Sequence, residues 1–263
     1  MDKIPSAAPC IRAAASLADA GRDAGLRAAA VLRDALSSHG AARVIFASAP
    51  SQQRMLAELA AAPDIDWTRV TSFHMDEYLG LDPEHPNGFG LWLRNLLPDA
   101  ALPGFSRIDT TGRPAAEAAR YSALITEAPI DLVCLGIGVN GHIAFNEPGV
   151  SGPDDSETAR IVTLDDASRM QQVHEGLFAQ LDDVPTQALT LTIPALLSGR
   201  SLVCSVSGSH KADAVARALL GPIDDSCPAS FLRTHDDVEW FLDPDAAALL
   251  KPTTDAADAS LQI

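Results

Sequence analysis

Two kinds of apolar pattern alternate along the chain. Short runs of consecutive apolar residues are typical of buried strands, and between them lie longer segments whose apolar residues recur at helical spacing. Strands are expected at 43–47, 67–74, 130–136, 201–207 and 238–242. Helices are expected at 10–38, 51–61, 88–97, 114–128, 211–220 and, as a shorter one, 228–234. This alternation predicts an α/β fold: a single doubly wound, mostly parallel sheet with helices on both faces, as in Rossmann-like proteins.

The longest predicted helix, 10–38, is rich in alanine. Four of its residues share one face at helical spacing: Leu26, Ala29, Leu32 and Leu36. Gly40 follows as a stop signal, because glycine commonly ends helices. No internal repeat or long linker interrupts the chain, so we expect one domain over residues 1–250 and a loose polar tail at 251–263.

The chain of 263 residues carries a formal net charge of -16. Such an acidic surface repels phosphate groups, which argues against non-specific binding to nucleic acid or to an anionic membrane. A phosphorylated small molecule remains compatible with this charge if a positive pocket is built locally. The length suffices for one large α/β domain or for two small ones.

The cysteines form no CxxC pair, and two of them lie in predicted strands: the four are Cys10, Cys134, Cys204 and Cys227. We expect free thiols packed in the core rather than disulfides or metal ligands. The seven histidines show no HxxxH spacing. Residues 1–9 lack a signal-peptide pattern, and no apolar stretch approaches the roughly 20 residues that span a bilayer. We therefore expect a cytoplasmic protein without a metal site.

A glycine-rich segment follows the predicted strand 130–136 and reads GIGVNGHIAFNEPG over 136–149. Its glycines allow a sharp turn and a close approach to a ligand. His142 lies a few residues before Glu147, and a carboxylate at that distance can orient an imidazole for acid–base work. In open α/β folds, ligands bind just past the carboxyl ends of the strands. A tight turn in which the histidine only caps the backbone remains the alternative.

A second strand ends in adjacent carboxylates, Asp76 and Glu77, within the segment SFHMDEYLGL at 72–81. Paired acids in a desolvated site have separated pKa values and can serve as base and acid. An ordinary turn that closes the strand explains the same pattern.

These two segments resemble the signature motifs of the glucosamine-6-phosphate deaminase family, whose wider superfamily includes the 6-phosphogluconolactonases. The ending FNEPG is similar to the deaminase branch. VPTQALT at 184–190 and SGSHK at 207–211 resemble later family elements, so the similarity covers roughly residues 43 to 235. The resemblance implies isomerisation with deamination of an amino-sugar phosphate, most simply glucosamine 6-phosphate, without a metal or organic cofactor.

The resemblance also implies catalytic roles for particular residues. Asp76 matches the base that moves a proton between C2 and C1 of the open-chain sugar, and His142 matches the residue that opens the pyranose ring. Glu147 matches the carboxylate partner of the histidine. Asn140 takes a third relay position where many family members have Asp, and since Asn carries no charge, His142 would depend more on Glu147.

The remaining predicted residues bind substrate. Arg169 and Lys211 match the family's phosphate-binding Arg and Lys, although a solvated helix residue and a first-turn cation are the plain alternatives. Further predicted substrate-binding residues come from the two motifs and from the loop after the first strand: Glu77, Gly138, Gly141, Ser48, Ser51 and Gln52.

Two segments depart from the family pattern. The family's first loop is rich in Gly and Thr/Ser and holds the substrate phosphate through backbone N–H groups, whereas the stretch 46–53 reads FASAPSQQ and has no glycine. This leaves open a different amino-sugar phosphate, such as galactosamine 6-phosphate. After the FNEPG loop, Arg160 is present but Val162 stands where a Lys is expected. We therefore predict that activation by an N-acetylated sugar phosphate is absent.

Two further functions compete with the deaminase interpretation. A lactonase would use the histidine loop to activate water, but Asp76, Glu77 and the FNEPG ending disfavour it. A catalytically silent sugar-phosphate sensor would fit the altered loop, but it has no need of a proton-transfer base. The sequence leaves a homo-oligomer open, and it does not choose between gluco and galacto epimers.

Overall fold

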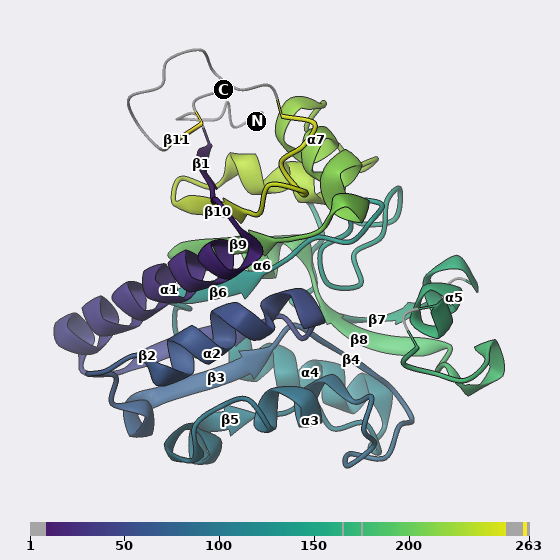
Figure 1. Ribbon diagram of the computed structural model, residues 1–263. Coiled ribbons are helices and arrows are strands. Elements are labelled where there is room, and N and C mark those ends of the chain that lie inside the picture. Colours follow the sequence, from purple (N-terminus) through teal and green to yellow (C-terminus); the bar gives the residue numbers. More distant parts are fainter. Residues whose placement is uncertain (1–8, 165, 175, 251–259, 262–263) are drawn as a thin grey trace.

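The computed structural model describes residues 9–164, 166–174, 176–250 and 260–261. Its main sheet has eight strands in the order β11-β1-β10-β9-β6-β2-β3-β5 (Figure 1). All neighbouring pairs are parallel except β1 with β11, which is antiparallel at the sheet edge. The strands are β1 (Cys10–Ala13), β2 (Ala42–Phe46), β3 (Val70–His74), β5 (Phe105–Ser106), β6 (Leu132–Leu135), β9 (Ser201–Val206), β10 (Val238–Leu242) and β11 (Ser260–Leu261). The predicted mostly parallel α/β sheet is confirmed.

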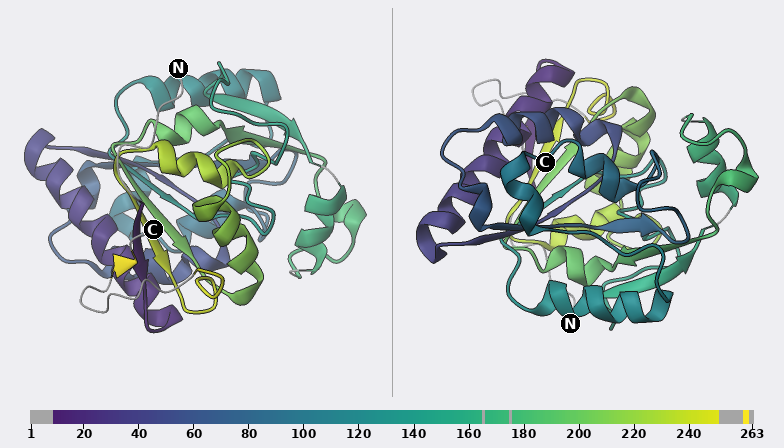
Figure 2. Two further views of the ribbon diagram at one scale, coloured as in Figure 1. Left: turned by 90° about the horizontal axis from the view of Figure 1, so that it is seen from above. Right: turned by 90° about the horizontal axis from the view of Figure 1, so that it is seen from below.

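Helices cover both faces of this sheet (Figure 2). One face carries α1 (Leu17–His39), α2 (Gln53–Ala61) and α3 (Phe89–Arg94), and the other carries α4 (Pro114–Thr126), α6 (Ile193–Leu197) and α7 (Ala212–Leu220). The strands serve both layers because successive side chains point to opposite faces. In β2, Val44 and Phe46 pack in one apolar cluster while Ile45 packs in the other. This double burial explains why the central strands read as continuous apolar runs.

The prediction of a helix over 10–38 is wrong at its start. Cys10–Ala13 form β1, which pairs with β10, and α1 begins only at Leu17, after Ser16. The Ser16 hydroxyl accepts a hydrogen bond from the Asp19 N–H at 3.1 Å and so caps the helix. The end is as predicted, since Gly40 adopts a left-handed φ of 78° at the C-cap.

The face of α1 also differs from the prediction. Leu26 is 47% exposed, although it shares the predicted apolar stripe with Leu32, which is fully buried. The buried face is formed largely by alanines, which allow α1 to pack closely on α2 and on the sheet. The spacing of the leucines alone therefore predicts a buried face that is rotated around the helix axis from the face that α1 actually buries.

Other boundaries shift by one turn or less. The predicted helix at 51–61 begins with a 3-10 turn at Pro50–Gln52, and the predicted strand at 67–74 begins with one at Trp67–Arg69. The short predicted helix at 228–234 is a 3-10 helix over Pro228–Thr234. Most of the predicted polar tail lies outside the described residues.

A second, antiparallel sheet of three strands was not predicted. Its order is β4 (Asp76–Tyr78), β8 (Gln187–Leu191), β7 (Ala159–Thr163). Beyond β7, the helix α5 (Asp166–His174) lies at one side of the molecule (Figures 1 and 2), where Val173 packs against the apolar cluster that contains Tyr78 and Phe145. The sequence missed this sheet because its strands are short and β4 opens with two carboxylates, which are uncommon in strands.

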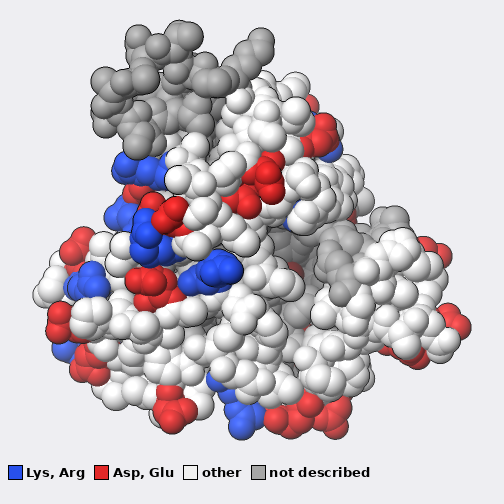
Figure 3. All heavy atoms as spheres, in the orientation of Figure 1, with Lys and Arg blue, Asp and Glu red and all other residues white. Residues whose placement is uncertain are grey.

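The charges and thiols are distributed as the composition suggests. Acidic and basic side chains are interspersed on the face shown in Figure 3, which is hollowed between the α5 region and the body. The four cysteines are free, and three of them are buried. Burial raises the pKa of the Cys134 and Cys204 thiols, so both stay protonated in the core. No helix within the described ranges is long and apolar enough to cross a membrane.

Candidate active site

The candidate site lies where the main sheet meets the small sheet. The chain passes from β3 to β4 at Met75, so that Asp76 begins the small sheet directly after the carboxyl end of a parallel strand. The glycine-rich loop leaves the carboxyl end of β6, two strands away in the sheet. Strand ends in an open α/β sheet are the usual place for a ligand site.

Strand β8 ties the two segments together. Thr190 lies opposite Asp76 in the antiparallel register. The Thr190 hydroxyl accepts a hydrogen bond from the Phe145 N–H at 3.1 Å, and the Asn146 amide donates to the Leu191 carbonyl at 2.8 Å. One strand therefore positions both the carboxylate segment and the histidine loop.

Asp76 is held in a dry environment. The residue is only 7% exposed. Burial raises the pKa of its carboxyl group well above the usual range, and the negative charge of Glu77 raises it further. A carboxylate that is costly to keep charged binds a proton strongly, which is what a base for a carbon acid requires.

Glu77 differs from Asp76 in its hydrogen bonds. Its Oε1 accepts hydrogen bonds from the N–H groups of Tyr78 and Phe89 at 3.0 and 3.1 Å, and its Oε2 accepts from the Gly90 N–H at 2.7 Å. Burial raises the pKa of Glu77, whereas these three hydrogen bonds lower it. Glu77 thus anchors the first turn of α3, and its predicted contact with substrate stays a prediction.

His142, Glu147 and Asn140 form a connected relay. The His142 Nδ1 lies 3.2 Å from Glu147 Oε1, and the Asn140 side-chain amide donates to Glu147 Oε2 at 2.6 Å. The Asn140 Oδ1 in turn accepts from the His142 N–H at 3.1 Å. Asn140 therefore supports the carboxylate as a donor, and Glu147 is the group that carries the negative charge. The predicted dependence of His142 on Glu147 agrees with this geometry.

Two glycines make room for the relay. A Cβ at Gly138 would lie 2.2–2.4 Å from three atoms of the His142 ring. Gly141 has a φ of +89°, and a Cβ there would lie 2.5 Å from the Cys227 sulfur. Both predicted positions hence serve the fold of the histidine loop, and direct contact of Gly138 and Gly141 with substrate stays a prediction.

The glycine-free loop after β2 is fixed by side chains. The Ser48 hydroxyl donates to the Phe89 carbonyl at 3.3 Å. Gln52 is fully buried, and its amide donates to the Ser205 carbonyl at 2.9 Å and to Ser51 Oγ at 3.4 Å. Its Oε1 is buried without a hydrogen-bond partner. Ser48, Ser51 and Gln52 thus join this loop to α3 and β9, and phosphate binding by them stays a prediction.

Arg169 and Lys211 lie on separate elements. The Arg169 guanidinium donates to the carbonyls of Leu181 and Val184 at 2.7 and 3.0 Å, and it pairs with Asp166 at 2.9 Å. These bonds tie α5 to the following 3-10 helix, so a substrate phosphate would have to compete for the same donors. Lys211 ends the 3-10 turn Ser209–Lys211 that leads from β9 into α7. Their predicted phosphate contact stays untested.

Further residues of this region escaped the sequence analysis. The buried His74 bonds the Asp76 backbone, Thr190 bonds the histidine loop, and Arg217 on α7 donates to the Asn140 carbonyl at 3.3 Å and to the Ser226 carbonyl at 2.5 Å. His74 and Thr190 lie inside the recognised motifs and could have been found there. Arg217 lies outside every recognised motif, and it reaches Asn140 only because the fold brings α7 next to the histidine loop.

Arg160, which follows the FNEPG loop, is engaged within the chain. Its Nη1 pairs with Asp155 at 2.8 Å, and its Nη2 lies 3.4 Å from both the Asn146 side-chain oxygen and the Val150 carbonyl. Arg160 is thus bound within the chain, and the absence of activation by an N-acetylated sugar phosphate stays a prediction.

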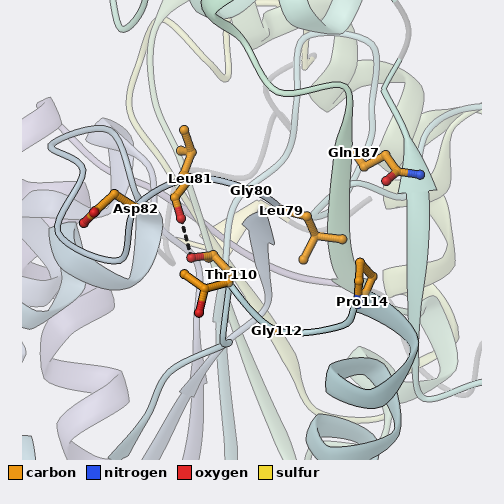
Figure 4. Close-up of a pocket in the computed structure, with 9 residues that line it drawn as sticks. Leu79, Gly80, Leu81, Asp82, Thr110, Gly112, Pro114 and Gln187 are labelled. Atoms are coloured by element: carbon orange, nitrogen blue, oxygen red, sulfur yellow. Dashed lines mark hydrogen bonds between the residues drawn. The ribbon is translucent and has the colours of Figure 1, made fainter.

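A separate cavity of about 550 Å³ opens between the loops after β4 and β5. Its nine lining residues are Leu79, Gly80, Leu81, Asp82, Thr110, Thr111, Gly112, Pro114 and Gln187 (Figure 4). None of the predicted catalytic residues is among them, whereas the carboxyl group with the raised pKa and the His142–Glu147 pair lie at the strand ends, which favours the strand ends as the active site. Within the part of the chain that the structure describes, His, Cys, Asp and Glu side chains form no group of three that could hold a metal.

The fold and these residues define an α/β protein with a buried carboxylate and a histidine–carboxylate relay at adjoining strand ends. Residues 15–240 match the family model described as glucosamine-6-phosphate isomerases/6-phosphogluconolactonase. The chain belongs to this family.

Relatives with known names agree with that assignment. A protein from Listeria welshimeri named glucosamine-6-phosphate deaminase is 38% identical over 211 residues, covering 78% of this chain and 86% of the relative. A protein of the same name from Streptococcus pneumoniae is 34% identical over 223 residues, covering 84% of this chain and 92% of the relative.

Solved structures show the same fold. A monomeric glucosamine-6-phosphate deaminase superposes with a TM-score of 0.83 at 27% identity, covering 91% of this chain and 99% of that protein. The 6-phosphogluconolactonase of Trypanosoma brucei superposes with a TM-score of 0.75 at 17% identity, covering 94% of this chain and all of its own. At that identity the second likeness concerns the fold alone.

Proposed function

We propose that this protein converts glucosamine 6-phosphate into fructose 6-phosphate and ammonia. The observation that carries the proposal is the desolvated Asp76 beside the His142–Glu147–Asn140 relay, both fastened to β8. The names of the relatives that cover most of the chain support the same reaction. We also propose that the enzyme acts in the cytoplasm and works without a metal or organic cofactor.

Ring opening is the task of the relay. His142 transfers a proton between the C1 hydroxyl and the ring oxygen of the pyranose, which yields the open-chain aldehyde. Glu147 orients the imidazole and balances the charge that the ring gains while it holds the proton. Asn140 holds Glu147 in place through its 2.6 Å hydrogen bond.

Isomerisation is the task of Asp76. The carboxylate removes the proton from C2 of the open-chain sugar while the aldehyde oxygen at C1 takes up a proton, which gives an enolamine, and the carboxyl group then delivers its proton to C1. The C2–N bond then becomes an imine, and water converts that imine to the ketone while ammonia leaves. The burial of Asp76 supports this role, because it raises the proton affinity of the base.

The phosphate is assigned to Lys211, Arg169 and the loop 47–53. The monomeric structural relative leaves the oligomeric state of this chain open. Substrate binding is proposed to draw the guanidinium of Arg169 away from the Leu181 and Val184 carbonyls, since an ion pair with phosphate is stronger than a hydrogen bond to a neutral carbonyl.

Ammonia release tests the proposal. The purified protein is incubated with glucosamine 6-phosphate, with galactosamine 6-phosphate, with unphosphorylated glucosamine and with 6-phosphogluconolactone, and both ammonia and lactone hydrolysis are followed. We expect ammonia from glucosamine 6-phosphate only. Ammonia release from galactosamine 6-phosphate alone would show that the substrate is the galacto epimer. Hydrolysis of 6-phosphogluconolactone alone would show that the reaction is that of a lactonase. Tight binding of a sugar phosphate without turnover would favour the sensor.

A further inference from the structure

The chain leaves the main sheet between His74 and Asp76, and at this junction side chains replace the lost sheet hydrogen bonds. Buried backbone groups need partners, so each one can be accounted for. The Tyr121 hydroxyl accepts from the His74 N–H at 3.0 Å and donates to the His74 carbonyl at 2.7 Å. The Met75 N–H donates to the Phe46 carbonyl at 3.1 Å, and the Met75 carbonyl accepts from the Leu191 N–H at 2.8 Å.

The imidazole of His74 completes this set. Its Nδ1 lies 2.9 Å from the Asp76 carbonyl oxygen, which can only accept, so Nδ1 carries the proton. Its Nε2 accepts from the Ile108 N–H at 2.9 Å. The ring is fully buried, and both nitrogens are used, which fixes the tautomer and the orientation of the ring.

We infer that His74, itself held by Tyr121, is the positioning residue for the base Asp76. Holding the Asp76 carbonyl fixes ψ at that residue, and ψ decides where the Cα–Cβ bond and the carboxylate point. Displacement of a reacting group by about 1 Å can cost about a hundredfold in rate. The inference rests on the proposed function for its kinetic consequence, and on geometry alone for the position of the carboxylate.

His74 does not share the proton chemistry. Burial lowers its pKa to about 3, so the ring is neutral at working pH. Protonation would also place an N–H on Nε2 directly against the Ile108 N–H. The residue therefore acts on Asp76 through the backbone and leaves the proton transfer to the carboxylate.

Two amide variants separate positioning from general support of the fold. In His74→Asn the side-chain NH₂ can reach the place of Nδ1, so the bond to the Asp76 carbonyl is kept and the Ile108 bond is lost. In His74→Gln the side-chain oxygen can reach the place of Nε2, so the Ile108 bond is kept and the Asp76 bond is lost. Both replace one buried ring by one buried amide, and we expect similar falls in Tm.

The expected kinetics differ between the two. His74→Gln should lower kcat for ammonia release by about 10–100-fold with KM changed by less than about threefold, whereas His74→Asn should stay within about threefold of the wild type in kcat. Equal losses in both variants, or an unchanged kcat in His74→Gln, would overturn the inference. If neither variant folds, Tyr121→Phe decides: a fall in kcat at unchanged KM supports the inference, and an unchanged kcat overturns it.

Crystal structures of the variants test the geometry without any substrate. The Asp76 carboxylate should stay within about 0.5 Å of its wild-type place in His74→Asn and should leave it in His74→Gln. An unmoved carboxylate in both variants would overturn the positioning role even if the wild-type protein released no ammonia. Failure of the proposed reaction is seen separately, as a wild-type protein without turnover.

Discussion

The two halves of the proposed catalytic centre are built differently. Asp76 lies in a short strand of the small sheet, opposite Thr190, and is only 7% exposed. The side chains of His142 and Glu147 are 22% and 16% exposed, and they sit on a loop shaped by glycines. The proposed base is therefore tuned by burial, whereas the proposed relay is arranged by the hydrogen bond from Asn140 to Glu147 and by the approach of His142 to Glu147 at 3.2 Å, and its side chains are still partly exposed.

This difference matches the two proton transfers. Taking a proton from carbon needs a strong base in a fixed place, and burial provides both. Exchanging protons between sugar oxygens is easier and profits from a group that can take up and release protons near neutral pH, as histidine does. We call the buried surroundings of Asp76 the dry side and the partly exposed His142–Glu147–Asn140 relay the wet side. Changes on the dry side should mainly affect the rate of isomerisation, and changes on the wet side should mainly affect ring opening.

The largest effect is expected from Asp76→Asn. The amide cannot accept the C2 proton, so kcat should fall by about a thousandfold or more. Ammonia release measures the rate, and binding of a sugar phosphate should remain measurable by calorimetry. Activity equal to that of the wild type would remove Asp76 from its assigned role.

Asp76→Asn, which should lower activity, should not lower the stability of the fold. The folded-state pKa of Asp76 is raised, so the carboxyl contributes stability below its unfolded pKa, and this contribution is lost as the pH rises through the folded pKa. Above the pKa that this carboxyl group has in the unfolded chain, the buried Asp76 therefore lowers the stability of the fold. Asp76→Asn should thus be at least as stable as the wild type near pH 7 in thermal unfolding, and a lower Tm there would contradict the desolvation argument.

On the wet side, Gly138→Ala should displace the His142 ring. The added Cβ would lie 2.2–2.4 Å from ring atoms, so the imidazole has to rotate away from Glu147. We expect kcat/KM to fall by about 10–100-fold. Gly152→Ala is the matched control, because a Cβ there meets nothing within 4 Å. Similar activity in Gly138→Ala and Gly152→Ala would show that the His142 ring does not occupy this position, next to Gly138, during catalysis.

The pH dependence gives a finer test of the dry side. Activity should fall as the pH drops below the raised pKa of Asp76, because the base must be deprotonated. The negative charge of Glu77 contributes to that shift, so Glu77→Gln should move the acid limb of kcat/KM to lower pH. Glu77→Asp keeps the charge and should leave the limb closer to its original place. An acid limb that stays put in Glu77→Gln argues that another group sets it.

The smallest effect is expected from Arg217→Met. Arg217 connects α7 to the Asn140 carbonyl, so its loss should loosen the relay loop and lower kcat by about 3–10-fold. Arg94→Met serves as the control, since Arg94 pairs with the exposed Glu84 at 2.9 Å, away from the relay. If both variants keep full activity, the contact from α7 is dispensable for the relay.

The sequence predicted the order of the main elements because buried parallel strands read as apolar runs. It failed at Cys10–Ala13, where the pairing partner β10 lies at the other end of the chain and the neighbouring alanines favour a helix. It also failed at the small sheet, because β4 is three residues long and begins with Asp76 and Glu77. Tertiary pairing, rather than local preference, makes these segments strands.

For the site, the motifs identified the segment that brings His142, Glu147 and Asn140 together, but not what each side chain contacts. Asp76 and Glu77 look alike in the sequence, and the structure separates them: one is a desolvated carboxyl, and the other anchors α3 through three backbone N–H groups. Gln52 is predicted to bind substrate from the loop after the first strand, and the structure shows it fully buried, with its amide bonded to the Ser205 carbonyl. The direction of a side chain depends on the pleat and the packing, which spacing alone does not give.

The pairing of β4 with β8 has a consequence for how the enzyme is made. Asp76 meets Thr190 only after the ribosome has added the intervening chain, which takes several seconds at about 5–20 residues per second. Until then Asp76 has no β8 beside it, remains hydrated and keeps the proton affinity of an ordinary carboxylate. The proposed base is thus completed late in synthesis, when the residues of β8 emerge, and a chain interrupted before them would be released without the buried Asp76.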